Sequence, residues 1–549
     1  MRRATREVMV GKVGIGGDNP VRIQSMTTSN TRDEQATAEQ IMRLADAGCE
    51  IARVTVQGKR EALACERIKN LLVKKGYDIP LVADIHFYPP AALLVADFID
   101  KVRVNPGNYI DRRATFKVLE YDDESYAREL ERIDERFSPL VLKCKEKHVA
   151  MRIGVNHGSL SDRIMNRFGD SPRGMVESAV EFANVCRKHD FHNFLFSMKS
   201  SNTNVMIEAY RLLVKTMDEL GWDYPLHLGV TEAGNGMAGR VKSAVGIGAL
   251  LLEGIGDTIR VSLTEDPWHE IEPCKELIRL PMNPEPFKRA RPQVSKPLHK
   301  DGSVVLQVNN ADIMHEDFYE HIGCELQLGR LLRKVDTADA LIVEGEITPD
   351  AQKKLDRLKE IGIEPVDVTL FTESEGRVFF KRHEEPVILK LDGTNTVHVA
   401  AKAGALLIDG CGEGICLTGL EPSMARELSF AILQAARMRS SKTEFIACPS
   451  CGRTLFNLQE VTKRIQEKTA HLPGVKIAIM GCIVNGPGEM ADADFGYVGS
   501  RAGKIDLYVG KTCIEKNIDE EDALNRLIDL IKAYDRWVEP TPALAECLS

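Results

Sequence analysis

Short apolar runs that end in polar residues alternate with helix-like stretches over residues 20–270. The runs lie at residues 21–26, 51–56, 80–87, 101–107, 150–156, 194–199, 226–232 and 258–262. The intervening stretches carry helical periodicity; within residues 39–47, for example, Ile41, Leu44 and Ala45 share one face. Strands that alternate with helices eight times over about 250 residues predict an N-terminal (β/α)8 TIM-like barrel in an α/β protein.

The rest of the chain predicts two further domains. Prolines between residues 281 and 297 indicate a linker. Beyond it we expect strands at residues 304–308, 340–343, 387–391 and 405–408 and a helix at 350–362, which together predict an inserted α/β domain without a catalytic motif. The last part predicts strands at 445–447, 476–480 and 505–509 and helices at 458–468 and 519–537, a small C-terminal α+β domain. The expected domain limits are 1–285, 286–435 and 436–549.

Polar residues gather within the barrel runs and toward their carboxyl ends, where barrel enzymes place their active sites. They are Arg53, Asp84, His86, Arg103, Asn105, Arg152, Asn156, Lys199, Glu232, Arg260 and Ser262. Five are cationic, and unpaired buried charges are costly, so their convergence predicts a ligand with several negative charges, such as a diphosphate, gripped by planar guanidinium groups. The alternative for each arginine is an ion pair with a neighbouring carboxylate.

Two carboxylates among these residues have separate interpretations. Asp84 and His86 lie two apart on a strand and so share a face, which suits a structural pair as well as a site. Glu232 ends its strand, where a carboxylate could act as a general acid if its neighbours raise its pKa.

Three cysteines follow apolar runs in the last part of the chain. Cys448 and Cys451 form a Cys-x-x-Cys motif, and Cys482 follows the next strand, with Glu489 shortly after it. Thiolates select zinc, Cu(I) or iron–sulfur clusters, and closed structural sites normally supply four protein ligands. Three thiolates favour an iron–sulfur cluster with one replaceable ligand, with zinc and free thiols as the alternatives. Glu489 by itself is better interpreted as an exposed loop carboxylate, because glutamate is a rare cluster ligand.

Composition narrows the class of protein. The chain has 549 residues, 43% hydrophobic and 28% charged, typical of a soluble enzyme. A net charge of −9 argues against nucleic-acid or membrane-surface partners, and no apolar run approaches the ~20 residues that span a bilayer. The N-terminus does not resemble a signal peptide, so we expect a cytoplasmic protein with reduced thiols.

One motif resembles a known family closely. Residues 480–489 and 491–496, with 21–28 and 81–87 of the barrel, resemble the 4-hydroxy-3-methylbut-2-enyl diphosphate synthases of the methylerythritol phosphate pathway. The middle section resembles their long three-domain form, which implies that the inserted α/β domain is a second barrel-like domain with a structural role. The resemblance implies an oxidoreductase that opens the ring of 2-C-methyl-D-erythritol 2,4-cyclodiphosphate and removes a hydroxyl group to give a linear allylic diphosphate. It implies a [4Fe–4S] cluster held by Cys448, Cys451, Cys482 and Glu489, reduced by ferredoxin or flavodoxin.

The same resemblance implies roles for the barrel residues. The five cations, with Asn105, Asn156 and Ser262, would hold the diphosphate, Glu232 would assist loss of the hydroxyl, and Asp84 and His86 would shape the site. A homodimer is expected, and the cluster could close on its own barrel or on a partner's. Two other functions stay open: a binding or structural module with a zinc-held C-terminal domain, and an anion-binding barrel enzyme of the pterin-dependent synthase kind.

Overall fold

The structure, a computed structural model, describes residues 1–86, 88–110, 120–282, 287–483, 486–490 and 492–539. Some residues of the expected elements lie outside this part of the chain. They are Phe87 at the end of the third expected strand, and Val484, Asn485 and Ala491 in the second cysteine motif. Among the described helices, none combines the length and the apolar character needed to cross a membrane.

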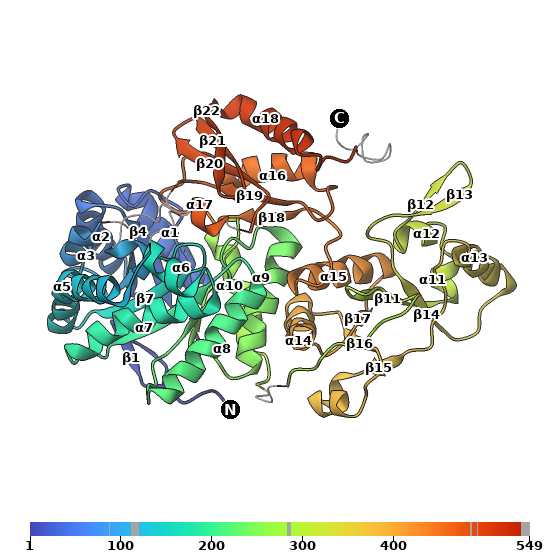
Figure 1. Cartoon of the computed structure of the whole chain (residues 1–549), viewed down its shortest axis with the longest axis horizontal. Coiled ribbons are helices and arrows are strands. Elements are labelled where there is room, and N and C mark those ends of the chain that lie inside the picture. The colour runs from blue at the N-terminus through green and yellow to red at the C-terminus, as the bar shows by residue number, and fades with distance from the viewer. Residues whose placement is uncertain (87, 111–119, 283–286, 484–485, 491, 540–549) are drawn as a thin grey trace.

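Eight parallel strands form the N-terminal barrel (Figure 1). They are β3 (Arg22–Met26), β4 (Ile51–Val56), β5 (Leu81–Ile85), β6 (Lys101–Val104), β7 (Ala150–Asn156), β8 (Phe194–Lys199), β9 (His227–Leu228) and β10 (Thr258–Ile259). Neighbours in the sheet follow chain order, β10 pairs with β3, and a parallel bridge between Phe196 and Leu226 joins β8 to the start of β9. The predicted barrel and its eight strands are confirmed.

Helices surround the barrel strands. They are α1 (Glu34–Ala47), α2 (Lys59–Lys74), α3 (Pro89–Val95), α4 (Pro106–Tyr109), α5 (Asp123–Lys147), α6 (Asp162–Phe168), α7 (Pro172–Lys188), α8 (Thr203–Glu219), α9 (Gly236–Leu252), the 3-10 helix η1 (Pro267–Glu270) and α10 (Ile271–Ile278). In α1 the Asp33 side chain accepts the Ala36 N–H, and the left-handed Gly48 (φ 103°) ends the helix. Its buried Ile41 and Leu44 turn toward the strands, as the periodicity predicts.

An antiparallel hairpin of β1 (Val8–Val10) and β2 (Val13–Ile15) closes the amino end of the barrel. Its Val8, Val10 and Ile15 form one apolar cluster with residues at the starts of four barrel strands, Ile51, Val82, Ala150 and Leu195. Because this end is filled with apolar side chains, the polar residues at the opposite end are the ones that a ligand can reach.

The inserted domain is a parallel half-barrel sheet in the order β14-β11-β17-β16-β15. Its strands are β11 (Ser303–Asn309), β14 (Ala340–Glu344), β15 (Thr369–Phe371), β16 (Val387–Asp392) and β17 (Gly414–Thr418), and β12 (Cys324–Gln327) pairs with β13 (Arg330–Arg333) in a separate hairpin. Its helices are α11 (Asn310–Met314), α12 (Phe318–His321), α13 (Pro349–Lys359), α14 (Thr396–Ile408) and α15 (Pro422–Ala435), with the 3-10 helices η2 (Glu373–Glu375) and η3 (Arg377–Lys381).

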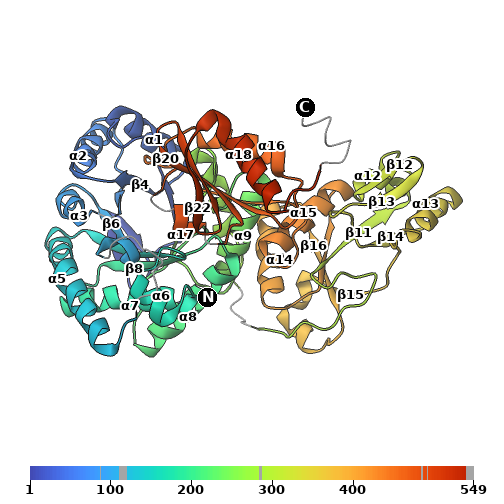
Figure 2. The same ribbon diagram turned by 45° about the horizontal axis from the view of Figure 1, so that its top comes forward.

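One expected strand of this domain is wrong. Residues 405–408 form the last turn of α14, not a strand. Helix α14 lies between the inserted sheet and helix α9 of the barrel (Figures 1 and 2), so nearly all its faces are buried. A helix covered on several sides shows no polar face, and a short apolar run from it cannot be distinguished from a buried strand by periodicity.

The C-terminal domain lies over the carboxyl end of the barrel (Figures 1 and 2). Its mixed sheet runs β18 (Glu444–Ala447), β19 (Lys476–Met480), β20 (Phe495–Arg501), β21 (Lys504–Val509) and β22 (Thr512–Asp519). The first three strands are parallel, and the last three pair antiparallel. Helices α16 (Leu458–Thr469), α17 (Gly486–Glu489) and α18 (Glu520–Ala533) complete it.

Glycines bring α9 and α14 into close contact. A side chain at Gly248 would collide with Ala401, and a Cβ at Gly404 would come within 2.7 Å of Val245. The inserted domain is therefore packed against the barrel through a contact that leaves no space for larger residues.

We expect Gly248→Val to destabilise the protein by about 1–3 kcal/mol, because a β-branched side chain forces the two helices apart. Ala238→Val, at an exposed position on the same helix, is the matched control and should change stability little. Urea unfolding of both variants measures the difference; equal stabilities would show that this contact does not hold the inserted domain.

Candidate active site

A cavity lies between the carboxyl end of the barrel and the C-terminal domain. Its empty volume is about 710 Å³. Met26, Arg53, Asp84, His86, Arg103, Arg152, Asn156, Lys199, Thr231, Glu232, Arg260 and Ser262 of the barrel line one side, and Cys448, Pro449, Ser450, Cys451, Arg453, Thr454, Met480, Gly481, Cys482 and Glu489 line the other. Every barrel strand, or the turn that follows it, thus contributes a residue to this cavity, which the barrel shares with the cysteine turns.

Fourteen of the fifteen residues singled out in the sequence line this cavity. The exception is Asn105, which is fully buried. Its side-chain oxygen accepts the Gly107 N–H at 3.2 Å and caps the short helix α4. Strand β6 ends at Val104, and Asn105, still extended, is the N-cap of α4, so its side chain caps the helix instead of facing the cavity.

Within the described residues, several cations of the cavity form no ion pair with a carboxylate. Arg53 donates to the Met26 sulfur, a weak acceptor, at 2.8 and 3.1 Å. Arg152 donates one N–H to Ser197 Oγ at 2.5 Å, while its Nε and Nη2 meet no hydrogen-bond partner within the described part of the chain. Burial lowers the pKa of Arg53 to about 10. Burial, reinforced by Arg152 and Arg53, lowers the pKa of Lys199 well below its usual value. The cavity therefore holds positive charge that an anion would stabilise.

Asp84 organises the cationic wall. Its carboxylate accepts from Arg103 at 2.9 Å and from Arg453 of the C-terminal domain at 3.3 Å. Burial alone would raise the pKa of Asp84, but the nearby guanidinium groups of Arg103 and Arg53 hold it well below the usual range. Arg103 also donates to Gly154 O at 3.0 Å and to Asn156 Oδ1 at 3.2 Å. One ionised carboxylate therefore fixes two arginines from two domains.

His86 lies between charged and amide neighbours. Burial, the largest cause, lowers its pKa to about 3, so the ring is neutral. Nε2 lies 2.6 Å from Arg103 Nη1 and 3.4 Å from Asp84 Oδ2. Nδ1 lies 3.0 Å from Asn108 Nδ2. The neutral ring therefore links the Asp84–Arg103 pair to Asn108.

The cysteine turns bring four candidate metal ligands to the cavity. Strand β18 leads into Cys448 and Cys451, and β19 leads into Cys482. The Gly481 N–H donates to Cys448 Sγ at 3.3 Å, and burial together with the nearby Cys451 and Cys482 raises the pKa of Cys448. Glu489 is 5% exposed, and its Oε2 has no partner among the described residues. Three sulfur donors and one uncommitted carboxylate oxygen suit a thiolate-bound cluster with one weaker ligand.

Glu232 lies beside Glu489 in the cavity. It follows β9 in a left-handed backbone conformation (φ 49°) that is uncommon for a residue with a side chain, and it is 4% exposed. Burial, followed by the neighbouring Glu489, raises the pKa of Glu232 well above its usual value. Two buried carboxylates side by side cannot both ionise easily, so Glu232 holds a proton near the cavity.

The C-terminal domain closes over the barrel of its own chain. Asn156 Nδ2 donates to Glu489 Oε1, and Thr264 Oγ1 donates to the Cys448 carbonyl at 3.0 Å. Lys242 pairs with Glu444 at 2.9 Å. Gly488 lies so close to the Gly158 carbonyl that a side chain at either glycine would collide with backbone.

Sequence reasoning missed three residues that shape the site. Arg453 lies two residues after the Cys-x-x-Cys motif, a position that could have drawn attention to it. Glu270 pairs with Arg260 at 2.9 Å and accepts from Ser25 at 2.6 Å. Met26 contacts Arg53. No local motif marks Glu270 or Met26, because their contacts form only when the barrel strands come together.

A closed barrel with a cationic cavity at its carboxyl end is the architecture of barrel enzymes that act on small anions. Comparisons with known proteins specify the family. Residues 5–275 match the family model described as the GcpE TIM-barrel domain, and residues 444–533 match that of the GcpE protein C-terminal domain. A Protochlamydia amoebophila (strain UWE25) protein named 4-hydroxy-3-methylbut-2-en-1-yl diphosphate synthase (flavodoxin) is 54% identical, over 98% of this chain and 97% of its own.

A second relative, from Arabidopsis thaliana, is named 4-hydroxy-3-methylbut-2-en-1-yl diphosphate synthase (ferredoxin), chloroplastic. It is 45% identical over 99% of this chain and 89% of its own. The chain belongs to the 4-hydroxy-3-methylbut-2-enyl diphosphate synthase family of isoprenoid biosynthesis. Among solved structures, a dihydropteroate synthase from Burkholderia cenocepacia is 12% identical with a TM-score of 0.34, over 51% of this chain and 95% of its own, a similarity too low to bear on function.

Replacing the Arg152 cation should maintain or raise the stability of the ligand-free protein and reduce the stabilisation by an anion. Arg152→Met should leave the ligand-free protein as stable as the wild type or more stable, since replacing a buried unpaired charge by an apolar group of similar size removes its desolvation cost. Pyrophosphate should raise the unfolding temperature of the wild type and raise that of Arg152→Met much less. Arg136→Met, at an exposed position on α5, should behave as the wild type. A full pyrophosphate response in Arg152→Met would contradict the assignment.

Proposed function

We propose that this chain reduces 2-C-methyl-D-erythritol 2,4-cyclodiphosphate to 4-hydroxy-3-methylbut-2-enyl diphosphate with an iron–sulfur cluster that has one exchangeable ligand. The observation that carries the proposal is the shared cavity: unpaired barrel cations face three cysteine sulfurs and a free carboxylate oxygen across it. Domain limits at 1–285, 286–435 and 436–549 complete the proposal, supported by three separate main sheets.

Cys448, Cys451, Cys482 and Glu489 would hold a [4Fe–4S] cluster. When bound, it supplies electrons one at a time and an iron with Lewis acidity at the Glu489 corner, because a carboxylate oxygen binds this iron more weakly than a thiolate. The chain's contribution is to keep Glu489 in reach: Asn156 donates to one of its oxygens and leaves the other uncommitted.

The barrel cations would bind and orient the cyclic diphosphate. Arg53 donates to the weak acceptor Met26 sulfur, and Arg152 keeps two nitrogens without a partner among the described residues, so both would offer donors to phosphate oxygens. Lys199 lines the same wall and would add a third donor. Arg103 is already committed to Asp84 and Asn156, and Arg260 to Glu270, so these two would add positive charge and fixed geometry. Ser262 lines the same wall. Asn105 would act through helix α4.

Glu232 would supply a proton to the departing hydroxyl. In the overall change, two electrons enter, the ring carbon–oxygen bond to the diphosphate breaks, and the hydroxyl leaves as water after taking up a proton. Glu232 is buried against the cavity in its protonated form, which is the form that a general acid needs. The C-terminal domain covers the carboxyl end of the barrel and would limit the access of bulk water to this proton transfer.

The electron donor would be a one-electron carrier of the ferredoxin or flavodoxin kind. The names of the two relatives support both choices. A reducing, cytoplasmic setting fits the twelve cysteines within the described part of the chain, all of them free thiols. The homodimer expected from the sequence stays a prediction.

Anaerobic purification with iron, sulfide and zinc analysis tests the cofactor. We expect about four irons per chain by the composition of a [4Fe–4S] cluster, and loss of iron and sulfide in Cys448→Ser and Cys482→Ser. Cys513→Ser, a partly exposed cysteine of the same domain, should keep its iron. Glu489→Ala should weaken retention without abolishing it, because three thiolates remain. One zinc per chain and no sulfide would establish the zinc alternative instead.

A mixing experiment tests whether each chain completes its own site. Glu232→Gln should keep the cluster spectrum but lower turnover by roughly 10²–10⁴-fold, the usual contribution of a general acid. Mixing Cys448→Ser chains with Glu232→Gln chains should restore no activity if the cluster serves the barrel below it, as the contacts of Glu489 and Cys448 suggest. Recovered activity would show that sites form between chains.

A further inference from the structure

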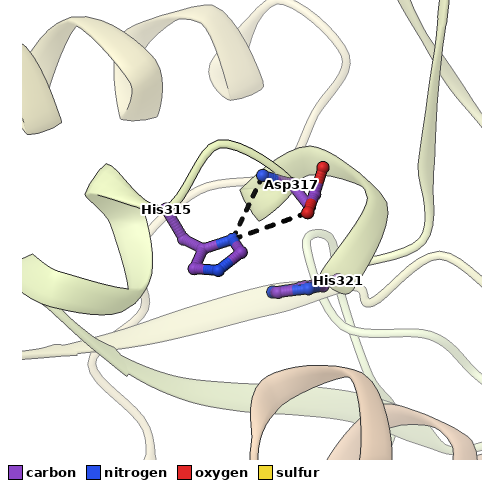
Figure 3. Close-up of side chains that lie close together, drawn as sticks. All are labelled: His315, Asp317 and His321. Atoms are coloured by element: carbon purple, nitrogen blue, oxygen red, sulfur yellow. Dashed lines mark hydrogen bonds and ion pairs between the residues drawn. The ribbon is translucent and has the colours of Figure 1, made fainter.

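The inserted domain carries a second group of metal-binding side chains, outside both family-model matches. His315 follows helix α11, Asp317 precedes helix α12, and His321 ends α12 (Figure 3). One ligand atom from each side chain lies within 4.8 Å of the other two. Helices α11 and α12 lie on the side of the molecule away from the barrel (Figures 1 and 2), so this group is separate from the cavity described above.

The local backbone explains why the three side chains meet. Asp317 and His321 are four residues apart and share a face of α12, with the His321 N–H donating to the Asp317 carbonyl at 2.9 Å. The Asp317 N–H donates to His315 Nδ1 at 3.2 Å and fixes that ring (Figure 3). The two imidazole centroids are 4.8 Å apart.

Buried neighbours hold this turn in place. Ile313, Phe318 and Ile322 are each fully buried, and they lie before, between and after the three polar residues along the chain. The side chains of His315 and Asp317 are 50% and 54% exposed. The ligand set therefore has an anchored backbone and side chains that are free to adjust.

The types of the three donor atoms indicate which class of metal ion this group of side chains suits. Two imidazole nitrogens with one carboxylate oxygen suit zinc and its neighbours, whereas magnesium and calcium prefer oxygen alone. His315 Nδ1 accepts the Asp317 N–H, so this ring would coordinate through Nε2. The three ligand atoms lie within 4.8 Å of one another, and metal–ligand bonds of about 2.0–2.2 Å need only a modest approach of these exposed groups. Glu316 and Glu320 are exposed in the same segment and add negative charge. Lys354 is the opposing charge, and its Nζ is bonded to the His315 carbonyl at 2.8 Å.

We propose that His315, Asp317 and His321 bind one divalent transition-metal ion of the zinc class, with water completing its coordination. The ion would join the end of α11 to α12 and stabilise this corner of the inserted domain. The inference is independent of the reaction in the barrel cavity, since none of the three residues lines that cavity.

Titration of Zn²⁺ into the full-length, cluster-loaded chain without a histidine tag tests the proposal, with the cluster iron measured before and after. We expect one zinc per chain, with binding weakened at least about tenfold, or 1.4 kcal/mol, in His315→Ala and in His321→Ala. Asp317→Asn should also weaken it, and this variant disturbs no helix cap, because the Asp317 side chain accepts no capping hydrogen bond.

His383→Ala is the matched control. His383 belongs to the same domain and pairs with one carboxylate, Glu385, at 2.7 Å. This variant should bind zinc as the wild type does, and zinc should raise the unfolding temperature of these two proteins but not that of His321→Ala. The proposal is overturned if the wild type binds no zinc while its cluster iron is intact, or if the histidine variants bind zinc with unchanged affinity.

Discussion

The buried carboxylate of Asp84 is the interaction on which the site depends. It is the anion that Arg103 of the barrel and Arg453 of the C-terminal domain share. Removing a charge from water is costly, and the cost is offset only when an opposite charge is held nearby. Asp84 therefore does more than balance charge: it joins the barrel rim to the turn that carries Cys451, and the two sides of the cavity are set relative to each other.

Three other cations of the cavity have no carboxylate partner of this kind among the described residues. Glu270 neutralises Arg260 and Asp84 holds Arg103, but Arg53 and Arg152 donate to the neutral Met26 and Ser197, and Lys199 lines the same wall. A barrel interior with excess positive charge is less stable than an apolar one, and the fold tolerates it because apolar packing elsewhere is extensive. The destabilising positive charge lies where a polyanion would bind, so a bound polyanion would stabilise the folded protein.

The inserted domain helps to position the C-terminal domain over the barrel. It packs on α9 of the barrel through α14, and α15 then leads by a short connection to β18 and the first cysteine turn. Arg437, in that connection, donates to the Ser201 carbonyl at 3.2 Å and also pairs with Glu444, which Lys242 contacts from α9. The strand that carries Cys448 is thus tied to the barrel where it leaves the inserted domain.

Much of this could be predicted from the sequence, because the barrel repeats one local pattern and the cysteine motif is compact. Strand positions follow from apolar runs, and residues at the carboxyl ends of parallel strands necessarily meet at one rim. What failed were features without a local signal. The apolar end of α14 resembled a strand because the inserted sheet and helix α9 bury nearly all faces of α14, so no polar face marks this segment as a helix.

The sequence by itself determined the barrel, the candidate ligand set and the cationic character of the rim, since these depend on residue type and spacing. Only the tertiary structure decided how they combine. It brought Arg453 to Asp84 and Asn156 to Glu489 across hundreds of residues, and it gave Asn105 to a helix cap instead of the cavity. Partnerships between distant charges depend on burial and on the relative placement of domains, and no periodicity along the chain encodes either.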